Sequence, residues 1–390
     1  MEITKKEIEA LAKKYDKTYE EMESDIEIFL NELKQTQKGI EDTIVKNGYI
    51  RFPDNLNIFG YGENNELNDK YICYTPNIKK ILQKDKKDIA IVSGFGATNT
   101  PTMGTLSMML KLIEFQKKTG LYTYCIINDL GSLNARNIDL EYVLELTDSF
   151  KQFLNKIGFD NSNGEIRTHN DIDHARTFSI VSSAVKLDDF VYNGEATDDT
   201  YKRLNLKGND FSVLVDHVYT ATDVLLPILK DGKSGIIVPC GLEEFYHANI
   251  GGIALGRIMQ DKTLSKLVPE DVEVGAVYSK LVSGFFPYFK QSKSIPNSSL
   301  NLGDTRKEIY GKIISCTERD EQVVMDMIAS STPFKPSFIQ EAREAFENRV
   351  KDYEAWLKYK FIFAEYIIGV KDIWDSCKPA ESNIRKRIYG

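Results

Sequence analysis

The stretch IAIVSGFGATNTPTMGT, residues 89–105, gives the clearest indication of the fold. Its first four residues, 89–92, form a short apolar run after the charged stretch KDKKD and are typical of a buried strand. A loop rich in glycine, threonine and proline follows, and a helix is predicted from about 105 to 118. Ligands of doubly wound sheets bind at the carboxyl ends of the strands, so Gly94 and Gly96 are candidate phosphate-binding positions, although a plain tight turn would also use them.

Strands and helices continue to alternate after this stretch. TYCIIND, residues 123–129, and GIIVPC, residues 235–240, are apolar runs typical of buried strands. Helices are predicted over about 139–157 and 243–258. This alternation predicts a parallel sheet with helices on its faces. The runs at 89–92, 123–128 and 235–240 should therefore be neighbouring parallel strands.

The two ends of the chain have a different character. A helix is predicted over residues 1 to about 38, with one apolar stripe at helical spacing formed by Met22, Ile26, Phe29, Leu30 and Leu33. Residues 47–80 are typical of short strands and loops. From about Thr317 onward, long charged helical stretches dominate. We therefore predict an α/β fold in three parts: an amino-terminal extension over 1–85, a Rossmann-like domain with a parallel sheet over 86–316, and a helical carboxy-terminal domain over 317–390.

Composition narrows the functional classes. Of the 390 residues 42% are hydrophobic and 28% are charged, which is typical of a globular protein. The net charge of −8 means that RNA binding would need a local basic patch. The five cysteines form no CxxC pair, which argues against a zinc site or a disulfide framework and fits a reducing compartment. The start of the chain is not typical of a secretory signal, and no apolar run approaches the ~20 residues of a membrane span. We expect a soluble, cytoplasmic protein with no metal site and no membrane partner.

The segment FKQSKSIPNSSLNLGDT, residues 289–305, is the most specific in the chain. Lys290 and Lys293 flank Ser292 in a turn-forming context. Lysines on a mobile loop suit the stabilisation of negative charge on a leaving polyphosphate. From composition alone, a solvated basic loop explains the same residues.

Two further segments place acidic residues beside apolar ones. In GLEEFYHANIGGIALGR, residues 241–257, Gly241 ends a predicted strand, and Glu243 and Glu244 begin a helix, where they would either cap it or face a ligand. In TATDVLLP, residues 220–227, Asp223 lies among apolar side chains. A buried aspartate needs a partner, which is supplied by the protein or by a ligand.

Taken in order, these segments resemble tryptophanyl-tRNA synthetases, with tyrosyl-tRNA synthetases next closest, over roughly residues 89–315. KQSKSIPNSSLNLGDT resembles the KMSKS loop of that family and the stretch that follows it. CIINDL, ATDVLL and VPCGLEEFYH resemble, in the same order as in the family, an apolar strand ending in aspartate, an A-A-D-I-L-like segment and a strand with its P-x-G-x-D-Q-like turn.

The chain departs from the family pattern at two places. The HIGH signature appears as TMGT, so Thr102 and Thr105 stand where the family has histidines, and only Gly104 is kept. Glu243 and Glu244 replace an Asp-Gln pair. An extra carboxylate about 6 Å from a phosphate costs roughly 3 kcal/mol at an effective dielectric constant of ~20. Both departures weaken the expected triphosphate site.

The resemblance implies ATP-dependent activation of an amino acid as an aminoacyl-adenylate, transfer to tRNA, and a homodimer. It assigns catalytic roles to Lys290, Ser292 and Lys293. It assigns binding of ATP, with Mg²⁺, to Gly94, Gly96, Thr102, Gly104, Thr105, Gly241, Glu243 and Glu244. Asp223 matches the aspartate that accepts the indole N–H of tryptophan, which favours tryptophan over tyrosine. For the dimer, the apolar helical face at 108–113 is a candidate surface in the Rossmann-like domain.

A second hypothesis remains open. The loss of both histidines and the added carboxylates favour a non-catalytic or repurposed homologue that binds a nucleotide, an amino acid or RNA. The lysine loop and Asp223 favour an enzyme. The sequence leaves open which of the two holds.

Overall fold

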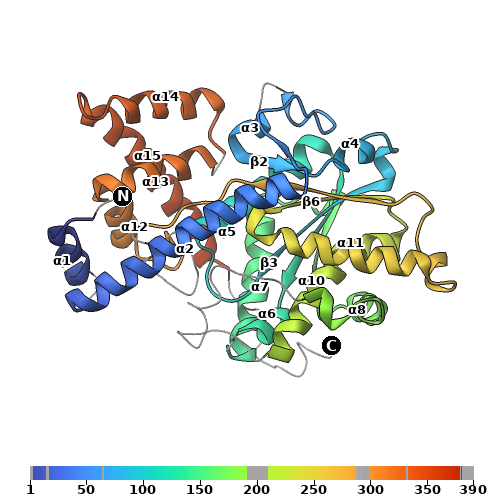
Figure 1. Cartoon of the computed structure of the whole chain (residues 1–390). Coiled ribbons are helices and arrows are strands. Elements are labelled where there is room, and N and C mark those ends of the chain that lie inside the picture. Colours follow the sequence, from blue (N-terminus) through green and yellow to red (C-terminus); the bar gives the residue numbers. More distant parts are fainter. Residues whose placement is uncertain are drawn as a thin grey trace.

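The computed structural model describes one sheet with helices on both faces and a group of helices beside it (Figure 1). The described residues are 3–14, 17–63, 66–136, 138–190, 210–286, 288, 291, 298–330, 333–377 and 379.

Within the described residues, seven strands form the sheet, in the order β1-β2-β7-β6-β3-β4-β5. Their bounds are Ile50–Arg51 for β1, Tyr71–Tyr74 for β2, Ile89–Gly96 for β3, Tyr122–Asn128 for β4, Gly164–Thr168 for β5, Gly235–Gly241 for β6 and Glu273–Ser279 for β7. The five strands from β7 to β5 are parallel, and β1 and β2 continue the sheet antiparallel. The predicted α/β class and the parallel pairing of the three predicted strands are confirmed.

Two strands of the sheet were not predicted. The strand β5 reads GEIRT and β7 reads EVGAVYS, so charged residues and glycine interrupt both apolar runs. Both owe their strand conformation to neighbours that are distant in sequence, because β5 pairs with β4 and β7 pairs with β6 along its whole length. Local periodicity does not carry such pairing information.

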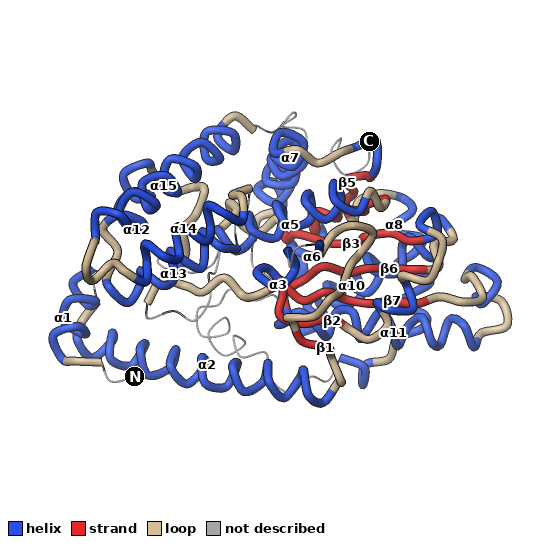
Figure 2. Tube along the Cα trace, turned by 90° about the horizontal axis from the view of Figure 1, so that it is seen from above, coloured by secondary structure: helices blue, strands red, loops and turns tan. Residues whose placement is uncertain are grey.

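Alternate residues of β3 point to opposite faces of the sheet. Ile89 and Ile91 belong to the apolar cluster beneath α5 (Met103–Thr119) and α7 (Leu140–Ile157). Ala90 and Val92 belong to the cluster beneath α8, α10 and α11, which span Ile172–Ala184, Asp210–Asp231 and Phe245–Gln260. Helices therefore cover both faces of the sheet (Figure 2).

The helix α10 corrects one sequence expectation. From Phe211 to Asp231 it is long and apolar enough to cross a membrane by length and composition, whereas no such run was expected. It packs against α6 (Leu130–Ala135), α8 and α11 and along β3, and it supplies Leu225 and Leu226 to the core. Its apolar character is therefore that of a partly buried core helix.

The carboxy-terminal helices share the core of the sheet domain. They are α12 to α15, with bounds Arg306–Ile314, Glu318–Ser330, Pro336–Glu347 and Tyr353–Asp375. Trp374 of α15 makes edge contacts with Phe150 and Phe153 of α7, at ring-centroid distances of 5.4 and 5.3 Å. One continuous apolar cluster runs from the sheet through these rings to Trp356.

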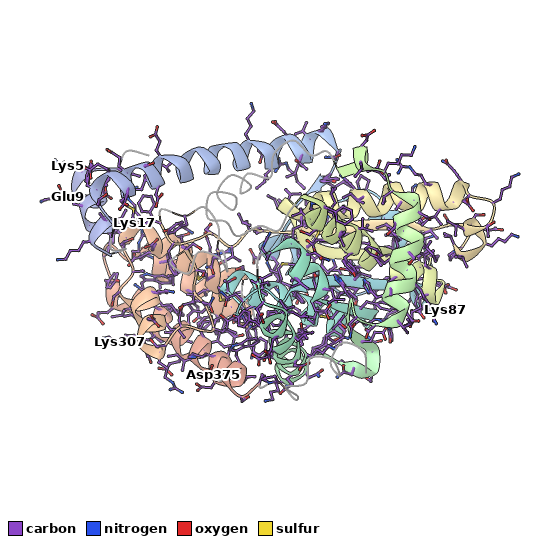
Figure 3. All side chains as sticks on the ribbon, turned by 90° about the horizontal axis from the view of Figure 1, so that it is seen from below. Lys5, Glu9, Lys17, Lys87, Lys307 and Asp375 are labelled. Carbon is purple, nitrogen blue, oxygen red and sulfur yellow. The ribbon has the colours of Figure 1, made fainter. Side chains whose placement is uncertain are left out.

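The amino-terminal region forms two helices instead of the single one expected. They are α1 (Lys5–Lys14) and α2 (Tyr19–Lys46), and Thr18 and Glu21 form a capping box that starts the second helix. Met22 and Ile26 of the predicted stripe are buried against α1. The long helix α2 runs from the carboxy-terminal helices toward the sheet, and Lys5 lies at the opposite end of the molecule from Lys87 (Figures 2 and 3). The short helices α3 and α4 span Glu66–Lys70 and Ile78–Ile81.

The helical face proposed for dimer contact lies inside this chain. Met109, Leu112 and Ile113 are buried in the core, and Met108 and Leu110 pack against it. An interface between two copies would have to use another surface.

We predict that Trp374→Ala lowers the free energy of unfolding by about 3–5 kcal/mol, because it removes the ring that joins α15 to α7. Denaturant titration followed by circular dichroism measures the change. Lys358→Ala, at an exposed position of the same helix, should change it by less than about 0.5 kcal/mol. An equal effect of both substitutions would contradict the shared core.

Candidate functional site

The carboxyl ends of β3 and β6 define the place where a ligand is expected. The helix after β3 covers one face of the sheet and the helix after β6 covers the other, so the strand order reverses between these two strands. Doubly wound folds bind ligands at such a reversal. The Ser93 hydroxyl donates to the carbonyl of Pro239 at 2.9 Å and joins the two strand ends. Gly94 and Gly96 end β3, and Gly241 ends β6, so the three predicted glycines meet at this edge.

The glycine-rich loop also contacts the segment that follows the lysine loop. The backbone N–H of Met103 donates to the carbonyl of Leu300 at 2.7 Å, and the N–H of Leu302 donates to the carbonyl of Pro101 at 2.9 Å. A Cβ atom on Gly104 would lie 3.9 Å from Cβ of Gln291. Two segments about 200 residues apart in sequence are therefore held side by side, in the order that the resemblance implies.

The predicted catalytic residues Lys290, Ser292 and Lys293 lie outside the described residues. Their assignment stays a prediction, and so does their position facing 93–105.

Thr102 and Thr105, which the resemblance aligns with the HIGH signature, have different surroundings. Thr102 is 2% exposed and is the N-cap of α5, where its hydroxyl oxygen accepts the backbone N–H of Thr105 at 3.4 Å. Thr105 itself lies within the first turn of α5 and is half-buried. The Thr102 hydroxyl therefore acts on the helix start, where an exposed N–H group needs an acceptor.

Glu244, the described member of the acidic pair after β6, does not cap the following helix with its side chain. Leu242–Glu244 form a 3₁₀ turn, Glu244 is exposed at the N-cap position of α11, and its side chain makes no capping hydrogen bond. The side chain of Glu243 lies outside the described residues. The turn lies at the end of β6, and the role of Glu243 and Glu244 in ligand binding stays a prediction.

Asp223 is the most deeply embedded of the predicted residues. It lies on α10 and is 7% exposed. Its Oδ1 atom lies 3.1 Å from Nε2 of His169 and 2.9 Å from Nε2 of His174. Its Oδ2 atom would lie 3.7 Å from a Cβ atom built on Gly94. One carboxylate oxygen is therefore engaged by histidines, and the other faces the end of β3.

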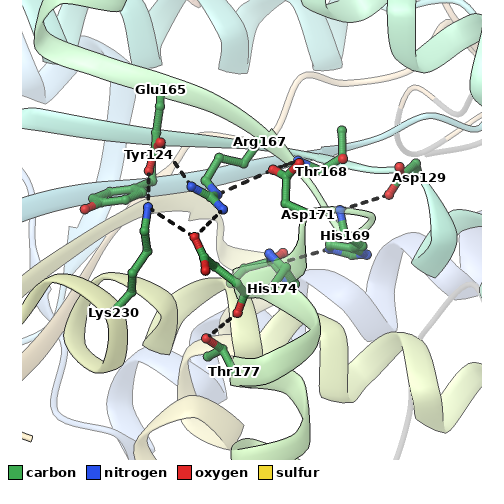
Figure 4. Close-up of polar contacts among 12 residues, drawn as sticks. Tyr124, Asp129, Glu165, Arg167, Thr168, His169, Asp171, His174, Thr177 and Lys230 are labelled. Atoms are coloured by element: carbon green, nitrogen blue, oxygen red, sulfur yellow. Dashed lines mark hydrogen bonds and ion pairs between the residues drawn. The ribbon is translucent and has the colours of Figure 1, made fainter. Parts of the chain in front are cut away.

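His169 lies in the turn between β5 and α8, and His174 lies in the first turn of α8. Arg167 forms ion pairs with Glu165 at 3.1 Å, with Asp171 at 3.5 Å and with Asp173 at 3.4 Å, and Lys230 reaches Glu165 at 3.3 Å (Figure 4). Oδ2 of Asp171 also accepts the backbone N–H of Thr168 at 3.1 Å. These contacts hold the turn on both sides of His169.

The pKa values of Asp223 and Asp129 are shifted in opposite directions. Burial alone would raise the pKa of Asp223, but the charge and hydrogen bonds of His169 and His174 outweigh it, so the pKa lies below its usual range. Burial raises the pKa of Asp129, which is 1% exposed at the end of β4. Asp223 is therefore the carboxylate that stays ionised.

Sequence reasoning missed the two histidines as site residues. They lie 54 and 49 positions before Asp223 in the chain, and only the turn sequence THNDIDH places them near a strand end. Among the described residues, His169, His174 and Asp223 form a group whose ligand atoms lie within 4.8 Å of one another and could hold a metal ion. The sequence had indicated no metal site.

Comparison with solved structures defines the class of fold. No protein-family model and no curated protein sequence matches the chain. The fold is that of class I tryptophanyl- and tyrosyl-tRNA synthetases, with a Rossmann-like sheet and carboxy-terminal helices.

Three structures illustrate the similarity. The tryptophanyl-tRNA synthetase of Aeropyrum pernix K1 matches with a TM-score of 0.67 at 15% identity, over 90% of this chain and 96% of that one. The tryptophanyl-tRNA synthetase of Encephalitozoon cuniculi, bound to tryptophan, gives a TM-score of 0.62 at 14% identity, over 89% of this chain and 98% of that one. The Archaeoglobus fulgidus tyrosyl-tRNA synthetase complexed with L-tyrosine gives a TM-score of 0.54 at 14% identity, over 80% of this chain and 93% of that one. At these identities the similarity establishes the fold alone.

We predict that Thr102→Ala lowers the free energy of unfolding by about 1 kcal/mol, because the first turn of α5 loses its cap. Thr105→Ala leaves the backbone donor in place and should change stability by less than about 0.5 kcal/mol. Thr102→Ser should restore most of the loss. Thermal or denaturant unfolding of the three variants measures these differences, and a larger loss at Thr105 would contradict the capping role.

Proposed function

We propose that the chain activates an amino acid with ATP, forms an aminoacyl-adenylate and transfers the aminoacyl group to tRNA. The favoured amino acid is tryptophan, and tyrosine is the alternative. The observation that carries the proposal is the position of Asp223: a buried, ionised carboxylate whose Oδ2 atom faces Gly94 at the end of β3. An aromatic side chain with an N–H or O–H group would find an acceptor there.

In the proposed reaction the carboxylate of the amino acid attacks the α-phosphorus of ATP. A bond forms between the carboxylate oxygen and phosphorus, and the bond to the bridging oxygen of pyrophosphate breaks. The protein contributes position and charge stabilisation without a nucleophile of its own. Lys290 and Lys293 would stabilise the leaving pyrophosphate together with Mg²⁺, Ser292 would support that loop, and the N–H groups at Gly94, Gly96 and Gly104 would approach the nucleotide.

The residues at the start of α5 lead us to expect a slow reaction. The Thr102 hydroxyl is engaged in helix capping, so this side of the triphosphate site has neither an imidazole nor that hydroxyl. An alternative function follows from the same observation: a non-catalytic homologue that binds a nucleotide, an amino acid or RNA.

Amino-acid-dependent exchange between ATP and pyrophosphate, tested with all twenty amino acids, separates the two functions. We expect slow exchange that tryptophan stimulates more than tyrosine does. Asp223→Asn should abolish the stimulation, and Lys293→Ala should lower the rate by about 10²-fold, as loss of one charge-stabilising group does in other enzymes. Thr177→Val, a buried change on α8 that removes only the hydroxyl donating to the carbonyl of Asp173, serves as the control.

Each other outcome has a defined meaning. Rapid exchange in the unmodified protein would contradict the weakened site, and absence of exchange with every amino acid would favour the binding module. Restoring both histidines is a poor test of the remaining site, since Thr102→His would remove the cap of α5 at a buried position. Thr105→His alone is the cleaner variant.

We also propose a homodimer, as the resemblance implies, with an interface outside 108–113. Light scattering at micromolar concentration should give about twice the mass of 44.4 kDa for one chain. A monomeric mass would contradict the proposal.

A further inference from the structure

Both the backbone and the imidazole ring of His169 are held by neighbouring side chains. The Oδ1 atom of Asp129 accepts the backbone N–H of His169 at 3.0 Å and that of Leu130 at 2.8 Å. The ring of Tyr219 stacks on the imidazole, with centroids 4.3 Å apart and planes within 6°. The ring of His174 lies near it with centroids 4.6 Å apart. The place and the plane of the His169 imidazole are therefore both constrained.

The hydrogen bonds of His169 assign its neutral tautomer. The backbone N–H of Gly131 donates to Nδ1 at 3.3 Å, so Nδ1 presents a lone pair and the ring proton lies on Nε2. Nε2 then donates to Oδ1 of Asp223 at 3.1 Å. A backbone N–H in the α6 turn is thus connected through one imidazole to the carboxylate on α10. A Cβ atom on residue 131 would clash with Oδ1 of Asn128 and with Oδ1 of Asp216, so a larger residue would displace these two side chains.

The tautomer of His169 argues against a metal ion, although the distances alone would suit one. The Nε2 atoms of His169 and His174 lie 3.1 and 2.9 Å from Oδ1 of Asp223, and ligand atoms of a tetrahedral zinc site with ordinary bond lengths lie about 3.3 Å apart. A metal would need an unprotonated Nε2 on His169, and Nδ1 would then carry a proton. That proton would face the N–H of Gly131, donor against donor. The hydrogen bonds of His169 therefore favour a hydrogen bond to Asp223 over a metal ligand at this imidazole, whereas Nδ1 of His174 forms no hydrogen bond within the described residues.

We propose that His169 is a positioning residue, which holds Oδ1 of Asp223 so that Oδ2 alone faces the amino-acid pocket and selects a ring that carries an N–H or O–H donor. The proposal rests on the proposed function for its ligand, but the tautomer can be tested without one. It also explains the expected effect of Asp223→Asn. Because His169 donates, the amide oxygen must turn toward His169, which leaves the amide NH₂ toward the pocket and repels a ligand donor.

Nitrogen NMR of protein with ¹⁵N-labelled histidine tests the tautomer directly. The chain has four histidines, so the spectrum contains four imidazoles, and His169→Gln identifies the signals of His169. Burial lowers the pKa of His169, but the Asp223 carboxylate outweighs burial and raises it above the ordinary value of about 6.5. Spectra are therefore recorded from about pH 8.5 upward until the ring is neutral, and in that form we expect a protonated Nε2 and an unprotonated Nδ1. A proton on Nδ1 would overturn the proposal. A shift of the Nε2 signals of both His169 and His174 on addition of equimolar Zn²⁺ would overturn it in favour of a metal site.

Binding calorimetry with tryptophan and 1-methyltryptophan tests the role in selectivity. The methylated ligand lacks the indole donor, so the unmodified protein should prefer tryptophan by roughly tenfold or more. His169→Leu should reduce the ratio toward one. His169→Gln should keep most of it, because its amide can donate to Asp223 in place of Nε2. Thr177→Val should leave the ratio unchanged.

The outcomes separate the two proposals. A ratio that is unchanged in folded His169→Leu protein overturns the positioning role, even where tryptophan binds. If the unmodified protein binds neither tryptophan nor tyrosine, the proposed function and the selectivity that rests on it fail together, while the NMR result still decides how His169 holds Asp223.

Discussion

Parallel pairing of β3 with β4 on one side and with β6 on the other is the constraint on which the site depends. Parallel strands must end at the same edge of the sheet, so every loop that follows them starts from that edge. The pairing brings together the glycines of β3 and β6, Asp129 after β4 and His169 after β5. Helices on both faces then supply the remaining contacts, with Asp223 arriving from α10.

The burial of Asp223 determines what surrounds it. An ionised carboxylate without partners costs several kcal/mol in the interior of a protein, so the fold has to provide donors. His169 provides one, and its orientation depends in turn on Asp129 and Gly131. These hydrogen bonds engage Oδ1 of Asp223 and leave Oδ2 directed toward β3. The contacts that make burial of Asp223 tolerable thus leave one oxygen as a hydrogen-bond acceptor. Recognition of an aromatic ring with an N–H or O–H group would need such an acceptor.

The start of α5 illustrates a different relation between structure and chemistry. Thr102 and Gly104 keep the strand–loop–helix geometry, and the loop remains paired with 300–302 as the motif order implies. The side chain at 102 caps the helix. The geometry of this loop therefore rests on backbone pairing and capping, neither of which requires histidines at 102 and 105.

The amino-acid sequence by itself determined the α/β class, three of the parallel strands, the order of the loops and the burial of Asp223, because apolar runs and glycine-rich turns are local signals. It predicted neither β5 nor β7, and it did not reveal that His169 and His174 meet Asp223. Those features depend on strand pairing and on contacts between residues about 50 positions apart, which no local pattern encodes. The tautomer of His169 was decided only by the tertiary structure, since the backbone N–H that sets it comes from a third segment of the chain.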